Sequence, residues 1–470
     1  MRSLLSVVAF SCLLTSFAIC ENPCGPPSYA CAASSQEVMQ LPKPMPAMGD
    51  PLHGVNAHWT DGGIFPGAEY IRVTDAGDDN PGSFGSFSMG DSGETSWVNA
   101  DSTLFLVARA GGGYVIKTWD KVNKLAGRTP LVFRHEIAFD PQNPNLIWER
   151  AGTQIYQNLI TSRSSWTVDR TLTFDFSADP KCLPNLGKPT WSGIFGISRD
   201  GGALLSAYSN RGPQETGVDV AVYYPGKGCR VLNTETGEVT GDFGPTGKVV
   251  GTNLRFALHE AVQAPNPDYA TMSSNRCFNA DGSESKCTLY LVWETTSLNL
   301  RECGTWPFSH PYCDGHGTLG WNSWAKGGRY WLHPYDAPNN PDVNLIPFPI
   351  GTDDHGSWPQ ILGKPDTLPA FAFTTKVKKP AGPNTIPFEN EVVGFDPSGS
   401  GKIYREGFNW NSGWSSGFAC QNAIGRVSWS GDLALLSTDG MGSFGSTSGS
   451  AECDLESGDC RCEIIAIPLK

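Results

Sequence analysis

The sequence predicts an all-β fold, a seven-bladed β-propeller with disulfide-bonded loops, on three observations. A strand-turn-strand segment recurs seven times along the chain. The composition favours strands and turns, with 54 Gly, 35 Pro, 15 Trp and 23 Phe among 470 residues. Few stretches carry Ala, Leu, Glu and Lys at helical spacing, so no long amphipathic helix is expected. Such short repeats cannot bury a core alone and become stable when they stack in a ring.

Each copy begins with a short apolar strand, passes through a turn of Asp, Asn, Gly or Pro, and ends in a second apolar strand. The seven copies span residues 93–107, 135–148, 191–208, 258–272, 315–332, 354–373 and 423–437. We expect the first strand of each copy to be the innermost of its blade. Glu463–Pro468 is predicted to complete a blade begun by Tyr70–Val73, because this pairing removes an exposed sheet edge. A β-sandwich is the structural alternative, although it does not predict seven similar hairpins.

The two ends of the chain suggest export. Residues 1–20 have the pattern of a secretory signal peptide, since one early Arg precedes an uncharged apolar run, and cleavage after Ala18 or after Cys20 fits. Residues 21–50 are Pro-rich and are expected to be extended, which leaves 51–470 as a single propeller domain. No segment is long and apolar enough to predict a membrane span. We therefore expect a secreted protein, extracellular or periplasmic.

Charge and cysteine content narrow the possible partners and compartments. The net charge of −13 argues against a nucleic-acid partner, because phosphate binding needs a basic face. Fourteen cysteines fit an oxidising compartment, and a zinc site at Cys460-x-Cys462 is the rival interpretation for that pair alone. The predicted disulfides are Cys24–Cys31, Cys182–Cys229, Cys277–Cys287, Cys303–Cys313, and Cys453 with Cys460 or Cys462.

Histidines near the first strands are the candidates for chemistry. In a ring, the starts of the innermost strands lie around one mouth of the axial channel. His259, His316 and His355 belong to consecutive copies, so neighbouring strands would present three imidazoles that bind a divalent metal (Mn²⁺, Zn²⁺ or Ca²⁺) or move protons. The alternative is hydrogen bonding between blades, which we favour for His135. The remaining histidines, His53, His58, His310 and His333, are expected to have structural roles in loops or outer strands.

Arginines and tryptophans beside the same strands are candidates for substrate binding. Arg134, Arg255 and Arg426 could each bind a substrate carboxylate through two parallel hydrogen bonds. Trp321 and Trp358 could stack on sugar rings. Inter-blade ion pairs and packing between blades are the structural alternatives. The motifs of serine hydrolases and of nucleotide-binding loops are absent from the sequence.

Gly315-His-Gly-Thr-Leu-Gly-Trp321 and Leu258-His-Glu260 resemble the His-bearing inner strands of oligogalacturonate lyases, and the hairpins also resemble the blades of uncharacterised secreted bacterial propellers. The first resemblance covers copies four to six. It implies that His316 and His355 hold a divalent metal that binds the uronate carboxylate, while His259 acts as a ligand or as the base that removes the proton α to it. The insertion from Cys303 to Cys313 departs from the family pattern.

The expected function is therefore a metal-assisted lyase, or a hydrolase, acting on uronate-containing acidic polysaccharide. A noncatalytic propeller that binds glycan or protein is the first alternative, since a propeller fold does not dictate function. A subunit of an extracellular assembly is the second alternative, suggested by the Gly-Ser-rich segment from Gly440 to Ser450.

Overall fold

The computed structural model describes most of the chain after residue 53. The described residues are 54–65, 67–75, 87–88, 97–109, 112–183, 189, 191–212, 216–252, 255–279, 281–302, 309–313, 317–322, 329–334, 343–344, 353–364, 367–375, 387–411, 424–444, 446, 448, 450 and 460–469. The predicted signal peptide, the Pro-rich segment and His53 lie outside them. So do Cys24, Cys31, Cys303, Cys453 and His316.

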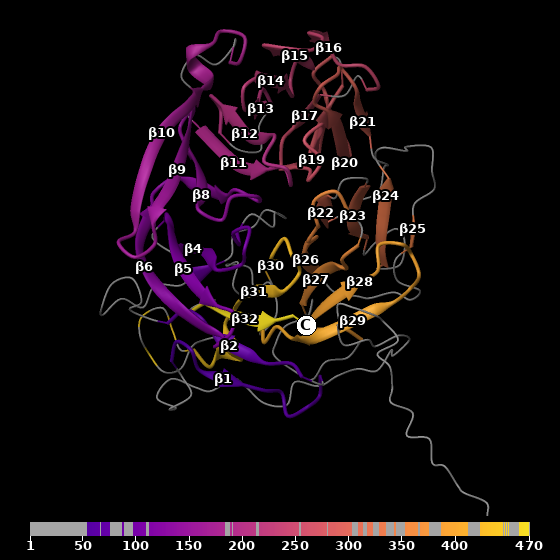
Figure 1. The fold of residues 1–470 in the computed structure, drawn as a ribbon. Helices are drawn as coiled ribbons and strands as arrows, with labels where there is room; N and C mark the ends of the chain where they lie inside the picture. The colour runs from indigo at the N-terminus through magenta and orange to yellow at the C-terminus, as the bar shows by residue number, and fades with distance from the viewer. Residues whose placement is uncertain are drawn as a thin grey trace, which may run out of the picture.

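The described strands form seven antiparallel sheets arranged around an axis, which confirms the predicted all-β propeller (Figure 1). We number the sheets as blades 1 to 7 in chain order. Blade 1 contains β3 (Phe87–Ser88), β4 (Leu104–Arg109), β5 (Tyr114–Asp120) and β6 (Leu125–Phe133). Blade 2 contains β7 (Glu136–Phe139), β8 (Leu146–Ala151), β9 (Gln154–Ser162) and β10 (Thr167–Asp175). Blade 3 contains β11 (Trp191–Ile197), β12 (Leu204–Ser209), β13 (Asp219–Tyr224), β14 (Gly228–Asn233), β15 (Glu238–Gly241) and β16 (Gly247–Lys248).

The second half of the ring has the same plan. Blade 4 contains β17 (Arg255–Ala257), β18 (Glu260–Gln263), β19 (Tyr269–Phe278), β20 (Glu284–Glu294) and β21 (Leu300–Glu302). Blade 5 contains β22 (Ser309–Cys313), β23 (Gly317–Asn322), β24 (Arg329–Pro334) and β25 (Val343–Asn344). Blade 6 contains β26 (Asp353–Ser357), β27 (Ala370–Thr375), β28 (Glu391–Phe395) and β29 (Ile403–Phe408). Blade 7 contains β30 (Gly425–Val427), β31 (Leu433–Thr438), β32 (Glu463–Pro468), β2 (Tyr70–Arg72) and β1 (His58–Trp59).

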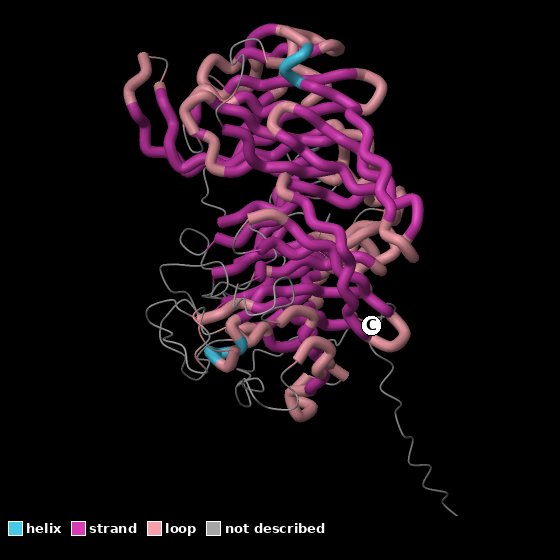
Figure 2. The backbone as a smooth tube through the Cα atoms, turned by 90° about the vertical axis from the view of Figure 1, so that its left-hand side faces the viewer, coloured by secondary structure: helices cyan, strands magenta, loops and turns pink. Residues whose placement is uncertain are grey.

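Helix is confined to two short 3-10 turns within the described residues, Phe176–Ala178 and Gly440–Gly442, and strands dominate the side view (Figure 2). No helix in the described part of the chain is long and apolar enough to cross a membrane.

One repeated hydrogen bond closes the turn between the first two strands of a blade. The first residue of the turn donates its N–H to the carbonyl oxygen of a residue at, or directly before, the start of the second strand. The five pairs are Asn99 with Leu104, Asp140 with Leu146, Ser198 with Ala203, Ala264 with Tyr269, and Ser428 with Leu433. In four of them the first residue is Asn, Asp or Ser, whose side-chain oxygen also accepts a backbone N–H within the turn. The turn chemistry seen in the sequence therefore sets the register of the hairpins.

The hydrophobic core lies between the faces of neighbouring sheets. Both faces of a blade are covered by other blades, so β12 and β13 are buried at every residue and their sequences are continuous rather than alternating apolar runs. One cluster joins blades 7, 1 and 2, others join blades 2 and 3, blades 3 and 4, and blades 6 and 7. Stability thus depends on the ring as a whole.

The closing blade combines both ends of the described chain, as predicted. The C-terminal strand β32 pairs with β31 on one side and with β2 on the other, with Ile71 opposite Ala466 and Arg72 opposite Ile465. The Arg72 guanidinium lies 3.2 Å from the Glu463 carboxylate, and the Arg461 guanidinium lies 3.0 Å from the same oxygen. All three side chains are buried.

The predicted strand order was wrong in blade 5. We expected the strand that follows His316 to be innermost, but β23 is the second strand, and β22 occupies the inner position beside β26. The sequence Ser309–Cys313 has no hydrophobic alternation that marks it as a strand, because its side chains include His, Pro and Cys.

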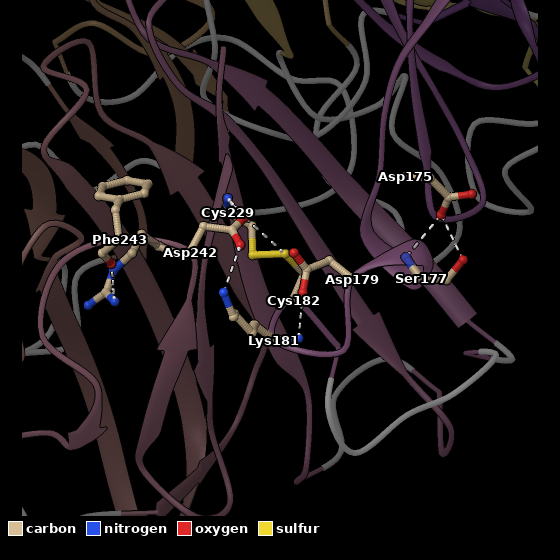
Figure 3. The surroundings of a disulfide bond; sticks show 9 residues. Asp175, Ser177, Asp179, Lys181, Cys182, Cys229, Asp242 and Phe243 are labelled. Carbon is tan, nitrogen blue, oxygen red and sulfur yellow. Dashed lines mark hydrogen bonds and ion pairs between the residues drawn. A yellow bond between two sulfur atoms is a disulfide. The ribbon is translucent and has the colours of Figure 1, made fainter. Parts of the chain in front are cut away.

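One predicted disulfide is confirmed with both partners described. Cys182 bonds to Cys229 of β14, with a Cα–Cα distance of 5.8 Å (Figure 3). Beside it, Asp242 accepts a hydrogen bond from the Cys229 N–H at 3.0 Å, and the Lys181 ammonium lies 3.8 Å from the Asp242 carboxylate. The bond fastens the connection that follows blade 2 to the middle of blade 3. Cys277 and Cys460 are also disulfide-bonded.

Arg199, in the turn after β11, spans the axis of the ring at the end where the turns lie. Its N–H donates to Pro265 O in blade 4 at 2.8 Å, its Nε donates to Gln360 O in blade 6 at 2.7 Å, and its guanidinium also donates to Pro141 O in blade 2 at 2.9 Å. The same guanidinium lies 5.1 Å from the centre of the Trp429 ring in blade 7. The side chain of Arg199 thus contacts three other blades, and its backbone N–H contacts a fourth.

Replacing Arg199 should destabilise the ring. In Arg199→Ala, the carbonyl groups of Gln360 and Pro141 lose their donor, and we expect the free energy of unfolding to fall by roughly 1–3 kcal/mol. Urea unfolding measures the change. Arg211→Ala is the control, because the Arg211 guanidinium forms only exposed contacts, with Glu235 and Thr216, among the described residues, and its loss should change stability by about 0–1 kcal/mol. Equal effects of the two substitutions would contradict the axial role of Arg199.

Candidate functional site

Of the histidines predicted to bind metal, His259 lies just before an inner strand and His355 lies within one. His259 is exposed and lies directly before β18, where its backbone N–H donates to Ser273 O at 2.9 Å. His355 lies within β26 opposite Phe373, and the structure describes its backbone only. The innermost strands β18, β22 and β26 follow one another in contact around the axis. The shared metal site formed with His316 therefore stays a prediction, since the side chain of His259 alone is described.

His135 occupies the position in blade 2 that His259 occupies in blade 4. Each lies five residues before the residue that closes the inner turn, Asp140 in blade 2 and Ala264 in blade 4. Both histidines are exposed at the end of the ring opposite Arg199. This end is consequently the one at which ionisable side chains of the inner strands reach solvent.

The predicted substrate-binding side chains separate into exposed and buried groups. Arg134 is exposed beside His135, and Arg255 is half-buried in β17. Arg426 is fully buried in β30, and Trp358 is only 2% exposed. A buried guanidinium or indole has no surface on which a sugar can rest, so packing between blades accounts for Arg426 and Trp358. The side chain of Trp321, in β23, lies outside the described residues.

A cavity of about 570 Å³ lies between blades 1 and 2, where the chain crosses from the outermost strand of one to the innermost strand of the other. Residues 130–135 form one wall, and side chains of β8, β9 and β10 form the other. The wall residues with ionisable or amide side chains are Arg134, His135, Glu149, Asn158 and Arg170. Leu131, Val132, Phe133 and Val168 supply apolar surface. A concave surface that combines apolar side chains with a few polar groups is a common form of ligand site.

The polar groups of this cavity are held in fixed positions. Arg170 Nε lies 2.8 Å from Glu149 Oε2, and Asn158 Nδ2 donates to the same oxygen at 3.2 Å. The Arg170 guanidinium also lies over the Tyr156 ring, 3.4 Å from its centre. The hydrogen bond to Glu149 raises the pKa of Arg170 despite a small opposing effect of burial. Arg170 therefore remains a fixed cation at the cavity wall.

A second ion pair lies on the other face of blade 2. Glu136, which follows His135, has its carboxylate 2.6 Å from the Arg150 guanidinium. Burial raises the pKa of Tyr114 in blade 1 to about 12, with a smaller contribution from the negative charge of Glu136. The charges of Glu136 and Arg150 compensate each other, so the exposed, unpaired positive charge among the described residues of the cavity is that of Arg134.

Sequence reasoning identified Arg134 and His135 but missed Arg170, Glu149 and the cavity itself. Glu149 stands in the apolar run of β8, where a carboxylate among buried neighbours is a detectable signal. Arg170 belongs to a strand with mostly exposed side chains, whose sequence carries no such signal. Among the described residues, the one cluster with metal-ligand spacing is Cys182, Cys229 and Asp242, and its two sulfur atoms are joined in the disulfide of Figure 3, so they cannot act as thiolate ligands.

No family model matches this chain, and no curated protein matches it. Among solved structures, it is similar to a prolyl endopeptidase, with 13% identity and a TM-score of 0.38 over 78% of this chain and 49% of that chain. It is also similar to the β-propeller domain of Cps50 (Swd1) from Myceliophteria thermophila, with 13% identity and a TM-score of 0.28 over 49% of this chain and 80% of that one. A putative TolB from Agrobacterium tumefaciens gives 11% identity and a TM-score of 0.29 over 57% of this chain and 73% of that chain.

These likenesses concern the fold alone. The chain spans about half the length of the prolyl endopeptidase that it matches, since 49% of that chain is covered. The protein is a β-propeller, and its function has to be argued from its own side chains.

One buried acid lies apart from this cavity. Glu406 is the extra residue of a bulge in β29, because Arg405 lies opposite Val393 while Gly407 lies opposite Val392. It is 8% exposed, and its Oε1 has no hydrogen-bond partner in the described structure. Burial raises its pKa to about 8.

Glu406 should make stability fall as the pH rises. Its folded pKa of about 8 exceeds the ordinary carboxyl value, so its stabilising contribution is complete below about pH 4.5 and is lost as the pH rises towards about 8. In Glu406→Gln this loss should disappear, which makes the variant more stable than the wild type by a few kcal/mol above about pH 8. Urea unfolding at about pH 5 and about pH 9 measures it. Exposed Glu284→Gln is the control, and a wild-type pH dependence retained in Glu406→Gln would disprove the assignment.

Proposed function

We propose that this protein is a secreted propeller that binds acidic, uronate-containing polysaccharide in the cavity between blades 1 and 2. The observation that carries the proposal is the position of Arg134 at the cavity wall, exposed and without an ion-pair partner among the described residues. A guanidinium in this state offers two parallel donors to a carboxylate. The net charge of −13 makes such a local cation the main attraction for an anionic chain.

The rest of the cavity fits a sugar chain. Arg170 lies on the opposite wall, where its charge is paired with Glu149 and its guanidinium packs on the Tyr156 ring. Val132, which is 53% exposed, and half-buried Val168 offer apolar surface for the faces of a sugar ring. One guanidinium that is unpaired within the described part of the chain, beside apolar surface, suits a ligand that combines carboxylates with the apolar faces of sugar rings. The signal-peptide pattern of residues 1–20 supports export, where such polymers occur.

Binding of polygalacturonate should depend on Arg134. We expect Arg134→Ala to weaken binding roughly tenfold, since one charge-assisted contact is lost. Arg128→Ala is the matched control, because Arg128 is exposed in β6, the strand that directly precedes Arg134, and does not line the cavity. Isothermal titration calorimetry at low and high salt measures both. Undiminished binding by Arg134→Ala, or an equal loss in the control, would contradict this site.

Metal-assisted lyase activity is the second candidate function. It is favoured by the exposure of His259 beside β18 and by the order of the inner strands β18, β22 and β26, which places His355 two blades away from His259 around the same axis. A metal held there would neutralise the uronate carboxylate, and an imidazole would accept the proton α to it. His259, His316 and His355 are the residues that would hold the metal.

Metal content distinguishes the two candidate functions. For a lyase, the purified protein should contain stoichiometric divalent metal and produce unsaturated uronates from pectic polymers, and His259→Ala should lose both. His135→Ala, changed at the equivalent position of blade 2, should keep its metal. A wild-type protein that contains no Mn, Zn or Ca, and that gives no unsaturated product, would exclude the lyase and leave the binding function.

A further inference from the structure

A second hollow lies on the outermost hairpin of blade 7 and shares no residue with the cavity between blades 1 and 2. Its volume is about 390 Å³. The hairpin of β1 and β2 supplies its walls, which are lined by His58, Trp59, Thr60, Ala68, Glu69 and the buried Phe65. The sequence indicated only a structural role for His58.

A chain of polar contacts orients His58. Its Nδ1 lies 2.7 Å from Glu69 Oε1, and the other oxygen of Glu69 contacts the Lys124 ammonium from the β5–β6 turn of blade 1. Burial raises the pKa of Glu69, but the hydrogen bonds from Lys124 and His58 outweigh it and lower that pKa overall. The ionised carboxylate can only accept, so Nδ1 carries the proton and Nε2 of a neutral imidazole is an acceptor.

The aromatic wall of the hollow is rigid. The Trp59 ring stacks on Tyr70 at 5.8 Å with an interplanar angle of 18°. Tyr70 is fixed in turn, since its hydroxyl donates to Asp61 at 3.0 Å and accepts the Phe408 N–H at 2.8 Å. The indole Nε1 of Trp59 is buried and has no hydrogen-bond partner within the described residues. A fixed indole beside an oriented imidazole provides apolar surface and an acceptor in one small hollow.

We propose that this hollow is a binding site for one neutral pyranose ring of a glycan, distinct from the site for acidic polymer. The ring would pack against Trp59, and a sugar hydroxyl would donate to His58 Nε2. The local charge disfavours a uronate, because Lys124 is already engaged by Glu69 and leaves no cation for a second carboxylate. Thr60 adds a hydroxyl that can donate or accept.

Calorimetry with galactopentaose and cellopentaose as neutral probes, and trigalacturonate as the acidic probe, tests the site. At least one neutral probe should bind the wild type. His58→Gln keeps a donor for Glu69 but loses the ring nitrogen, and Trp59→Phe keeps an aromatic ring of smaller area. Each should weaken neutral binding by about three- to tenfold without changing trigalacturonate binding.

The two proposed sites are separable by their variants. Arg134→Ala should leave neutral binding unchanged, so failure of the acidic site does not imply failure of this one. Binding of neither neutral probe would overturn the proposal, and so would neutral binding that both blade 7 variants retain in full. Thermal melting of His58→Gln and Trp59→Phe confirms that both are folded, and His58→Gln carries the test if Trp59→Phe unfolds.

Discussion

A buried ionic contact joins the two ends of the described chain and closes the ring. Glu463, in the C-terminal strand β32, lies between Arg72 of β2 and Arg461, and Thr74 Oγ1 donates to its other oxygen at 2.5 Å. Asp75 balances the second arginine, since its carboxylate lies 2.7 Å from the Arg72 guanidinium and 3.4 Å from that of Arg461. This compensation matters because breaking a buried pair leaves an uncompensated charge and costs about 3–5 kcal/mol. Burial raises the pKa of Glu463, and the two arginines oppose that rise. Every inter-blade surface depends on this closure, since an open ring would expose the faces of blades 1 and 7.

The two ends of the ring differ in structure: the inner turns lie at one end, and the connections from blade to blade lie at the other. Arg199 binds carbonyl groups from blades 2, 4 and 6 at the end where the inner turns lie. His135 and His259 lie at the other end, where the chain crosses from one blade to the next. The cavity that we assign to acidic polysaccharide is formed at the first of these crossings. Function is thus expected at the crossover end, with the turn end devoted to holding the blades together.

The repeats, the closing strand and one disulfide could be predicted because each depends on local chemistry. Turn residues such as Asp140 and Ser198 bond to residues five or six positions further along the chain. The apolar sequence of β32 identifies it as a strand, and pairing with β2 covers its exposed edge. Blade 5 was misread because β22 lacks a hydrophobic pattern. Trp358 and Arg426 were assigned to a surface because burial between blades depends on neighbours that the local sequence does not specify.

The cavity and the hollow could not be predicted for the same reason. Arg170 reaches Glu149 from a strand two positions away in the sheet, and Lys124 reaches Glu69 from another blade. Such contacts depend on the twist and packing of whole sheets. The positions of Arg134 and His135 could be predicted from the sequence, because both directly precede the inner strand β7.

Hydrogen–deuterium exchange with and without polygalacturonate tests the proposed polysaccharide site most directly, because it locates bound polymer without assuming which residue binds it. We predict slower exchange in the segment 130–135 and around Arg170 in β10, with the axial turn around Arg199 unchanged. Binding that leaves both cavity segments unprotected, or that protects another blade in their place, would contradict the assignment of this crossing as the polysaccharide site.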